Sequence, residues 1–196
     1  MTNTLATTVV VPNDLAASNG GASPTASFNL ATILPEAQRK PRLFVGANND
    51  GLPFYAWDKD AEARVHQQAR SFTAQVKGIR TMLVNEGTEK ESTKLVLDLA
   101  LEATGEEIGL SMGGNTYSAL TLVAAMSNLS AEQLANPIGI SGKAGAKGVV
   151  FLSVYADGQP VRNIDAEALI KEARQSGNQI EAIQGYVAEI QARIEA

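Results

Sequence analysis

Hydrophobic and polar residues alternate with a period of two in the middle of the chain, a pattern typical of β-strands with one buried face. The clearest stretch is 95–101, where leucine occupies every second position, and 107–112 alternates in the same way. Before them, 72–84 is a long strand candidate interrupted by Gly78, and a glycine inside a strand usually marks a bulge or bend. The pattern therefore predicts three consecutive strands, the first of them bent.

Helical spacing replaces this alternation in residues 116–129, where apolar side chains form a broad stripe. Residues 130–133 match a capping box, which predicts a second short helix, and Asn136-Pro137 ends it. Two further strands are predicted at 138–140 and 149–155. The predicted order is three strands, a helical region and two strands.

This order predicts a mainly β protein with helices, built on a five-stranded Greek-key barrel of the OB type with the helix between strands three and four. A bent first strand suits such a barrel, because that strand pairs on both sides to close it. We assign the barrel to residues 71–162. A flexible tail (1–40) and an aromatic hairpin with a connecting segment (41–70) precede it, and an amphipathic helix (163–196) follows it.

The residues before the predicted barrel differ in composition. Residues 1–27 are rich in Thr, Ala, Ser, Asn and Gly and bury too little to offset the entropy of ordering, although residues 9–11 (VVV) could add a strand to a neighbouring sheet. Residues 42–45 and 54–57, joined by an Asn-Asn-Asp-Gly turn signal, predict a hairpin that holds four of the ten aromatic residues. Residues 59–69 are charged and compatible with a helix that covers a surface.

Apolar positions near the C-terminus recur at alternating steps of four and three residues, after a candidate N-cap at Asp165. The positions are Leu169, Ala173, Ser176, Ile180, Ile183, Val187, Ile190 and Ile194. Two interpretations remain open: a single amphipathic helix packed on the barrel, or self-association of the chain. In the second, the oligomerisation seam consists of Ile180, Ile183, Val187, Ile190 and Ile194.

Several kinds of chemistry lack the residues that they need. The chain has no cysteine and one histidine, His66, which argues against thiolate catalysis, a zinc site and a histidine-based triad. The acidic residues at 58–62 lack the pattern of a calcium loop. The glycine-rich segment 142–148 lacks the Gly-Lys-Ser/Thr ending of a phosphate loop, and a strand follows it. We therefore expect no enzyme activity, no metal and no cofactor.

Targeting signals are also missing from the sequence. The N-terminus lacks the basic and apolar regions of a signal peptide, and no apolar run approaches the ~20 residues of a membrane helix. We expect a soluble, cytoplasmic protein that does not contact membranes. The absence of cysteine fits a reducing compartment.

The net charge of −5 is unevenly distributed along the chain. Residues 37–94 contain ten Lys or Arg against seven Asp or Glu, whereas residues 95–196 contain six against twelve. Such an asymmetry is expected if one surface meets a polyanion, although ordinary surface scatter also produces it.

Cations and aromatics are placed where an OB barrel would use them to bind a single strand. Lysine and arginine follow the phosphates in such a groove, and exposed aromatics stack on bases. The candidate cations are Lys77, Arg80, Lys90, Lys94, Lys143 and Lys147. The candidate stacking residues, each of which could instead lie in the core, are Phe72, Tyr155, Tyr55 and Trp57.

A region of about 90 of the 196 residues resembles small OB-fold single-stranded DNA-binding proteins of phages and mobile elements. The resemblance lies in the run from 72–79 (FTAQVKGI) through 93–99 (TKLVLDL), the turn and strand 105–112 (GEEIGLSM), the helix 117–129 and 149–158. The resemblance implies strand protection during replication or recombination, in a bacterial or phage-infected cell. Such proteins commonly end in a mobile acidic tail, whereas this chain ends in an apolar-seamed helix, which favours a homo-oligomer.

The leading hypothesis is therefore a non-enzymatic protein that binds single-stranded nucleic acid, DNA favoured, without strong sequence preference. The alternative is a structural subunit of a virion or filament. In that case the barrel is a scaffold and the terminal extensions make the subunit contacts.

Overall fold

The computed structural model describes two strand backbones near the N-terminus, the whole of the central region, and parts of the C-terminal region. The described residues are 8–11, 26–29, 40–162, 168–169, 171–172, 175, 177 and 179–196. Strands β1 (Thr8–Val11) and β2 (Ala26–Asn29) form an antiparallel pair of their own. The backbone of residues 9–11, for which addition to a neighbouring sheet was the alternative to a flexible tail, thus pairs with β2 of the same chain. Asp165, Ala173 and Ser176 lie outside the described residues.

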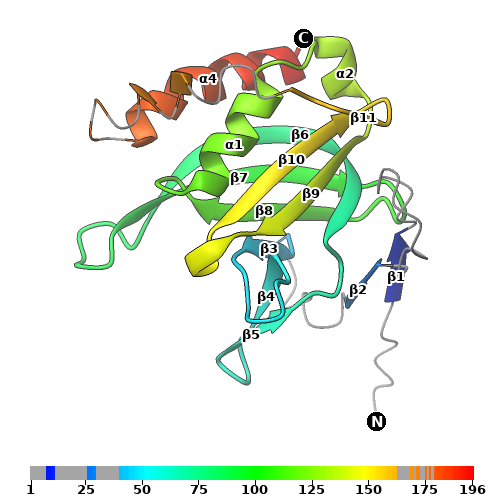
Figure 1. Cartoon of the computed structure of the whole chain (residues 1–196), viewed down its shortest axis with the longest axis vertical. Helices are drawn as coiled ribbons and strands as arrows, with labels where there is room; N and C mark the ends of the chain where they lie inside the picture. Colours follow the sequence, from blue (N-terminus) through cyan, green and yellow to red (C-terminus); the bar gives the residue numbers. More distant parts are fainter. Residues whose placement is uncertain are drawn as a thin grey trace.

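The remaining described strands form one sheet of nine, shown in Figure 1. In their spatial order they are β11 (Gln159–Pro160), β10 (Val150–Ala156), β9 (Ile138–Ala144), β6 (Ser71–Val84), β7 (Ser92–Leu101), β8 (Glu107–Gly113), β3 (Arg42–Val45), β4 (Phe54–Asp58) and β5 (Ala63–His66). The β3–β8 pair is parallel, and the other pairs are antiparallel. The protein is thus mainly β, with the helices α1 (Tyr117–Met126), α2 (Ala131–Ala135) and α4 (Gln179–Ile194).

All five strands predicted for the barrel are present, as β6 to β10, with α1 and α2 between the third and the fourth. The long strand β6 pairs with β7 along most of its length and with β9 through its first four residues. The register shifts between Val76 and Gly78, so the predicted bulge at the glycine is confirmed. The capping box at Ser130 and Gln133 is also confirmed.

The predicted closed barrel of five strands is wrong, because the sheet is open. Closure would require β8 to pair with β10. Instead β3 lies parallel along the free edge of β8, and β11 lies along the free edge of β10.

The predicted aromatic hairpin is confirmed as β3–β4, and it extends the same sheet. The helix considered for residues 59–69 is wrong as well, since residues 63–66 form β5 at the end of that sheet.

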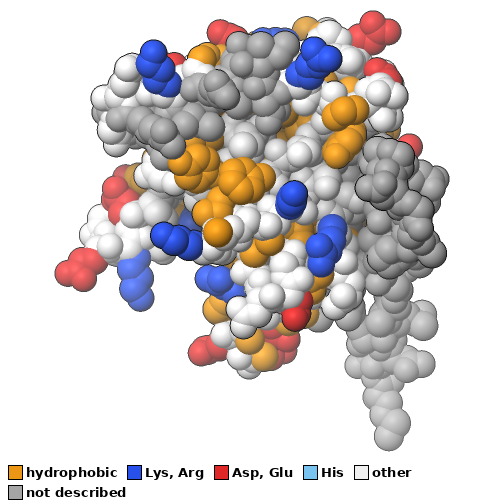
Figure 2. All heavy atoms as spheres, in the orientation of Figure 1, with side chains coloured by type: hydrophobic (Ala, Val, Ile, Leu, Met, Phe, Trp, Pro, Cys, Tyr) orange, Lys and Arg blue, Asp and Glu red, His pale blue; other side chains and the backbone are white. Residues whose placement is uncertain are grey.

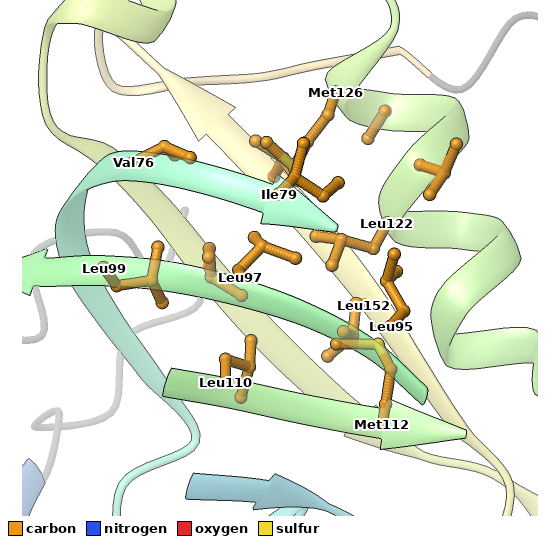
Figure 3. Packing of buried hydrophobic residues seen from close by; sticks show 14 of the residues in the cluster. Val76, Ile79, Leu95, Leu97, Leu99, Leu110, Met112, Leu122, Met126 and Leu152 are labelled. Atoms are coloured by element: carbon orange, nitrogen blue, oxygen red, sulfur yellow. The ribbon is translucent and has the colours of Figure 1, made fainter. Parts of the chain in front are cut away.

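The open sheet curls around a single hydrophobic core. Side chains from β6, β7, β8, β10 and α1 point into this core, as Figure 3 shows for Ile79, Leu97, Leu110, Leu122 and Leu152. Helix α1 is buried along nearly its whole length because it lies against β10 and α4. It begins at Thr116, whose hydroxyl accepts a hydrogen bond from the Ala119 amide.

Helix α4 packs against β6, α1 and α2 of its own chain. Ile183 and Ile190 are 0% exposed, and Val187 is also buried, so the apolar seam is covered within the chain. The Gln191 side-chain oxygen accepts a hydrogen bond of 2.7 Å from the Ile79 amide, just after the β6 bulge. Ile183, Val187 and Ile190 therefore pack within the chain, as in the first of the two interpretations. The assignment of Ile180, Ile183, Val187, Ile190 and Ile194 to oligomerisation stays a prediction. Among the described helices, none has the length and apolar character needed to span a membrane.

Candidate nucleic-acid interface

Strand alternation places aromatic and basic side chains together on the outer face of the sheet. In β3, Leu43 faces the core, so its neighbours Arg42 and Phe44 face outward. In β4, Phe54 and Ala56 are buried, so Tyr55 and Trp57 face outward. Phe44 lies directly opposite Tyr55, and both strands therefore present aromatic rings on the same face.

A groove of about 480 Å³ lies on this face, across β6, β7, β8, β3 and β4. We call it the basic groove. It is lined by Lys40, Pro41, Arg42, Phe44, Ala56, Trp57, Lys59, Arg80, Val96, Asp98 and Gly109. Four of these side chains are cationic and one is anionic, so the groove is suited to an anionic ligand.

The floor of the basic groove consists of small or apolar groups in the middle of the sheet. Gly109 has no side chain, and a Cβ added there would lie 3.7 Å from Arg42 Cγ and 3.9 Å from Val96 Cγ1. Those are ordinary van der Waals distances. A Cβ at residue 109 would therefore fit beside its neighbours, and a larger side chain there would extend into the groove.

Two of the four cations in the groove are paired with acids. Arg80 forms an ion pair with Asp98, and Lys40 Nζ lies 2.8 Å from Glu107 Oε2. The hydrogen bond with Glu107 raises the pKa of Lys40, so its ammonium stays charged. Arg42 and Lys59 form no ion pair with any described residue.

The aromatic side of the groove is held in place by ring contacts. Phe44 and Tyr55 stack with their centroids 5.4 Å apart, and the His66 ring lies 5.4 Å from Tyr55 on its other side. Arg64 Cζ lies 4.9 Å from the centroid of Tyr55, within cation–π distance. Trp57, in contrast, is 47% exposed, so its ring is accessible to a ligand.

A second surface combines aromatic rings and lysines on the outer face of β9 and β10. Phe151 is 43% exposed and lies directly opposite Lys143, and its ring centroid is 6.2 Å from that of Tyr117 at the start of α1. Lys147 is exposed in the turn between the strands. With Tyr155, which alternation places on the same side of β10, these residues make up what we call the hairpin face. Figure 2 shows apolar and basic side chains over this region, with acidic side chains toward the margins of the view.

The residues predicted from the sequence are divided between these surfaces. Arg80 and Trp57 line the basic groove, and Tyr55 stacks on Phe44, which also lines it. Lys143, Lys147 and Tyr155 belong to the hairpin face. The structure thus does not bring the predicted cations together in a single groove.

Three predicted cations lie outside both surfaces. Lys94 is on the outer side of β7, two residues from Val96 in the groove floor, and Lys90 is exposed in the β6–β7 loop. Lys77 is exposed at the β6 bulge, where it donates a hydrogen bond to the Gln75 side chain.

Phe72 belongs to neither surface, because it is 1% exposed and its ring makes an edge contact with Phe54 at 5.5 Å. It fills the core and cannot stack on a base in this structure, so we remove it from the candidate residues.

Sequence reasoning did not identify Lys40, Arg42, Phe44 or Lys59 as site residues. A signal for part of this set was present, because Arg42 with Phe44 and Tyr55 with Trp57 are spaced by two in strands of one predicted hairpin. That spacing places all four on one face.

No protein-family model, curated protein or solved structure matches this chain. Within the described part of the chain, no group of three His, Asp or Glu side chains is arranged to hold a metal ion.

Proposed function

We propose that this protein binds single-stranded nucleic acid, DNA favoured, through the basic groove and without strong sequence preference. The observation that carries the proposal is the exposed Trp57 ring beside Lys40, Arg42, Lys59 and Arg80. Aromatic stacking on a base contributes about 1–3 kcal/mol per base and tolerates any sequence, while cations follow the phosphates.

The groove suits a single strand better than a duplex. Stacking on Trp57 requires an open base face, and in a duplex both faces of each base are covered by neighbouring bases. The aromatic residues Phe44 and Trp57 and the four cations also line the same groove, so one nucleotide can contact a ring through its base and a cation through its phosphate. The proposed role is to protect or organise single strands in replication or recombination.

Two further features support this proposal. The order and pairing of β6 to β10 follow the OB-type order that suggested the resemblance to phage single-stranded DNA-binding proteins, although the sheet remains open. The assembly-subunit alternative relies on both terminal extensions, and in the C-terminal one Ile183, Val187 and Ile190 are already buried within the chain.

The test is a comparison of two variants that remove equally exposed apolar side chains. Trp57 is 47% exposed inside the groove, and Leu83 is 46% exposed outside it. Binding of a labelled oligo-dT is followed by fluorescence anisotropy. Trp57→Ala is expected to weaken binding roughly 5- to 100-fold, because one stacking platform is lost. Leu83→Ala is expected to leave the affinity unchanged.

Two results would contradict the proposal. Failure of the folded wild-type protein to bind oligo-dT at low salt would exclude the function itself. Binding by both variants as tight as that of the wild type would show that Trp57 does not belong to the binding site.

A further inference from the structure

We infer that the hairpin face is a second contact for the same strand, so that a strand too long for the basic groove continues past Lys94 to Phe151. This inference rests on the proposed function, and it assigns a separate set of residues to a longer ligand. The ligand class is single-stranded nucleic acid that extends beyond the groove.

The hairpin face offers the same two kinds of contact as the groove. Phe151 and Lys143 are cross-strand partners on the same outer side of β9 and β10, so a ring and an ammonium lie next to each other. Lys143 and Lys147 form no ion pair with any described residue. Their charges are available for phosphates.

The position of the Phe151 ring depends on Gly145. A Cβ at residue 145 would lie 2.7 Å from Phe151 Cε2, too close for a side chain. The ring therefore lies over the glycine backbone, with Tyr117 near its other side. This arrangement keeps a large apolar ring on the surface at a defined place.

Neighbouring residues connect the two surfaces. Val96 lines the groove, and Lys94 follows two residues away on the same side of β7. Lys94 is paired with Gly113 of β8, and the Gly113 carbonyl accepts a hydrogen bond from the Thr116 hydroxyl at 2.7 Å. Tyr117 comes next in the chain and contacts Phe151. The contacts thus run from the groove to the hairpin face.

The composition of the hairpin face favours a nucleic acid over a protein partner. Besides Phe151, Tyr155 and Lys143, the outer positions of β9 and β10 are Ser141, Ser153 and Gly139, which offer little apolar area. Rings flanked by lysines and separated by small residues match bases and phosphates. A protein partner would instead require a larger continuous apolar patch.

Binding measured with two lengths of oligo-dT distinguishes the contribution of the basic groove from that of the hairpin face. A short oligonucleotide of about 6 nucleotides fits one site, and one of about 30 exceeds the usual span of a single OB-type groove. Phe151→Ala is expected to weaken binding of the long oligonucleotide roughly 5- to 100-fold and to leave the short one unaffected. Trp57→Ala is expected to weaken both. Leu83→Ala is the control for loss of an exposed apolar side chain.

A second variant tests the position of the ring without removing it. Gly145→Ala shifts the Phe151 ring and preserves every charge, so it is expected to cause a smaller loss that is also selective for the long oligonucleotide. Sedimentation of each variant without DNA reports the oligomeric state. No change is expected in it.

The outcomes distinguish the two proposals. Trp57→Ala could weaken binding of both oligonucleotides while Phe151→Ala weakens binding of neither. That result would exclude the second contact and leave the proposed function standing. If Trp57→Ala has no effect on either, the groove is not the binding site. If Phe151→Ala changes the oligomeric state without DNA, the hairpin face is a protein contact and the inference is overturned.

Discussion

The basic groove and the hairpin face carry similar side chains, yet they are built in different ways. The groove combines residues from five strands and depends on the parallel pairing of β3 with β8, whose residues are far apart in the sequence. The hairpin face depends on one hairpin and the start of α1. Two of the groove cations are paired with acids, whereas Lys143 and Lys147 have no such partner among the described residues.

Each surface also depends on a glycine, but for opposite reasons. At Gly109 a Cβ would lie in ordinary van der Waals contact with Arg42 and Val96, and a larger side chain would extend into the groove. Gly145 supports a ring, and a side chain there would push the ring away. The comparison teaches that the glycines between the cations and rings decide where side chains can lie on each surface.

The largest expected effect separates core aromatics from surface aromatics. Phe72→Ala is expected to lower the free energy of unfolding by about 3–5 kcal/mol, because it removes a fully buried ring and leaves a cavity. Trp57→Ala is expected to change it by less than about 1 kcal/mol, as for most surface substitutions. Urea unfolding of both variants measures the difference. Equal stability losses would contradict the division between core and groove.

The second prediction fills the groove without changing its charge. Gly109→Val is expected to weaken binding of a short oligo-dT roughly 5- to 100-fold, because the space for a base is lost. Anisotropy titration measures the affinity. Gly185→Ala on the exposed side of α4 is the control, expected to leave binding unchanged and to add roughly 0.5–1 kcal/mol of stability. Unchanged binding by folded Gly109→Val would exclude the groove.

The smallest expected effect concerns the acid that neutralises Lys40. Glu107→Gln removes the ion pair at the rim of the groove and is expected to strengthen oligo-dT binding about 2- to 5-fold, the range of an exposed pair. Because Glu107 raises the pKa of Lys40, the pair contributes stability below the ordinary lysine pKa, and this contribution is lost as pH rises through the raised value. Anisotropy titration at neutral pH measures the gain. Weaker binding would mean that Glu107 itself contacts the ligand.

Much of the central fold could be predicted from the sequence because its signals are local. The alternating leucines of β7, the bulge at Gly78 and the capping box at Ser130 each depend on residues that are close in the chain. The β3–β4 hairpin was predictable for the same reason. Strand β5 was missed because residues 63–66 (ARVH) are few, charged and without clear alternation.

The sheet closure and the groove could not be predicted in this way. Whether β8 pairs with β10 or with β3 depends on competition between segments that are distant in the sequence. A local pattern of residues does not indicate which of the two pairings forms. The groove follows from that pairing, since it brings Arg42 and Phe44 beside Gly109 and Val96. A closed barrel predicts that Lys143 and Lys147 face the same groove as Arg80, whereas in the open sheet they lie on the hairpin face.

The central claim is that Trp57 lies in a groove that binds single-stranded nucleic acid. Trp57 is the only tryptophan in the chain, so its fluorescence reports directly on this groove. Titration with oligo-dT at several salt concentrations is expected to give a saturable fluorescence change. With four groove cations contacting phosphates, the logarithm of the affinity should fall with the logarithm of salt concentration with a slope of about −3. An unchanged Trp57 signal at low salt with folded protein would contradict the account.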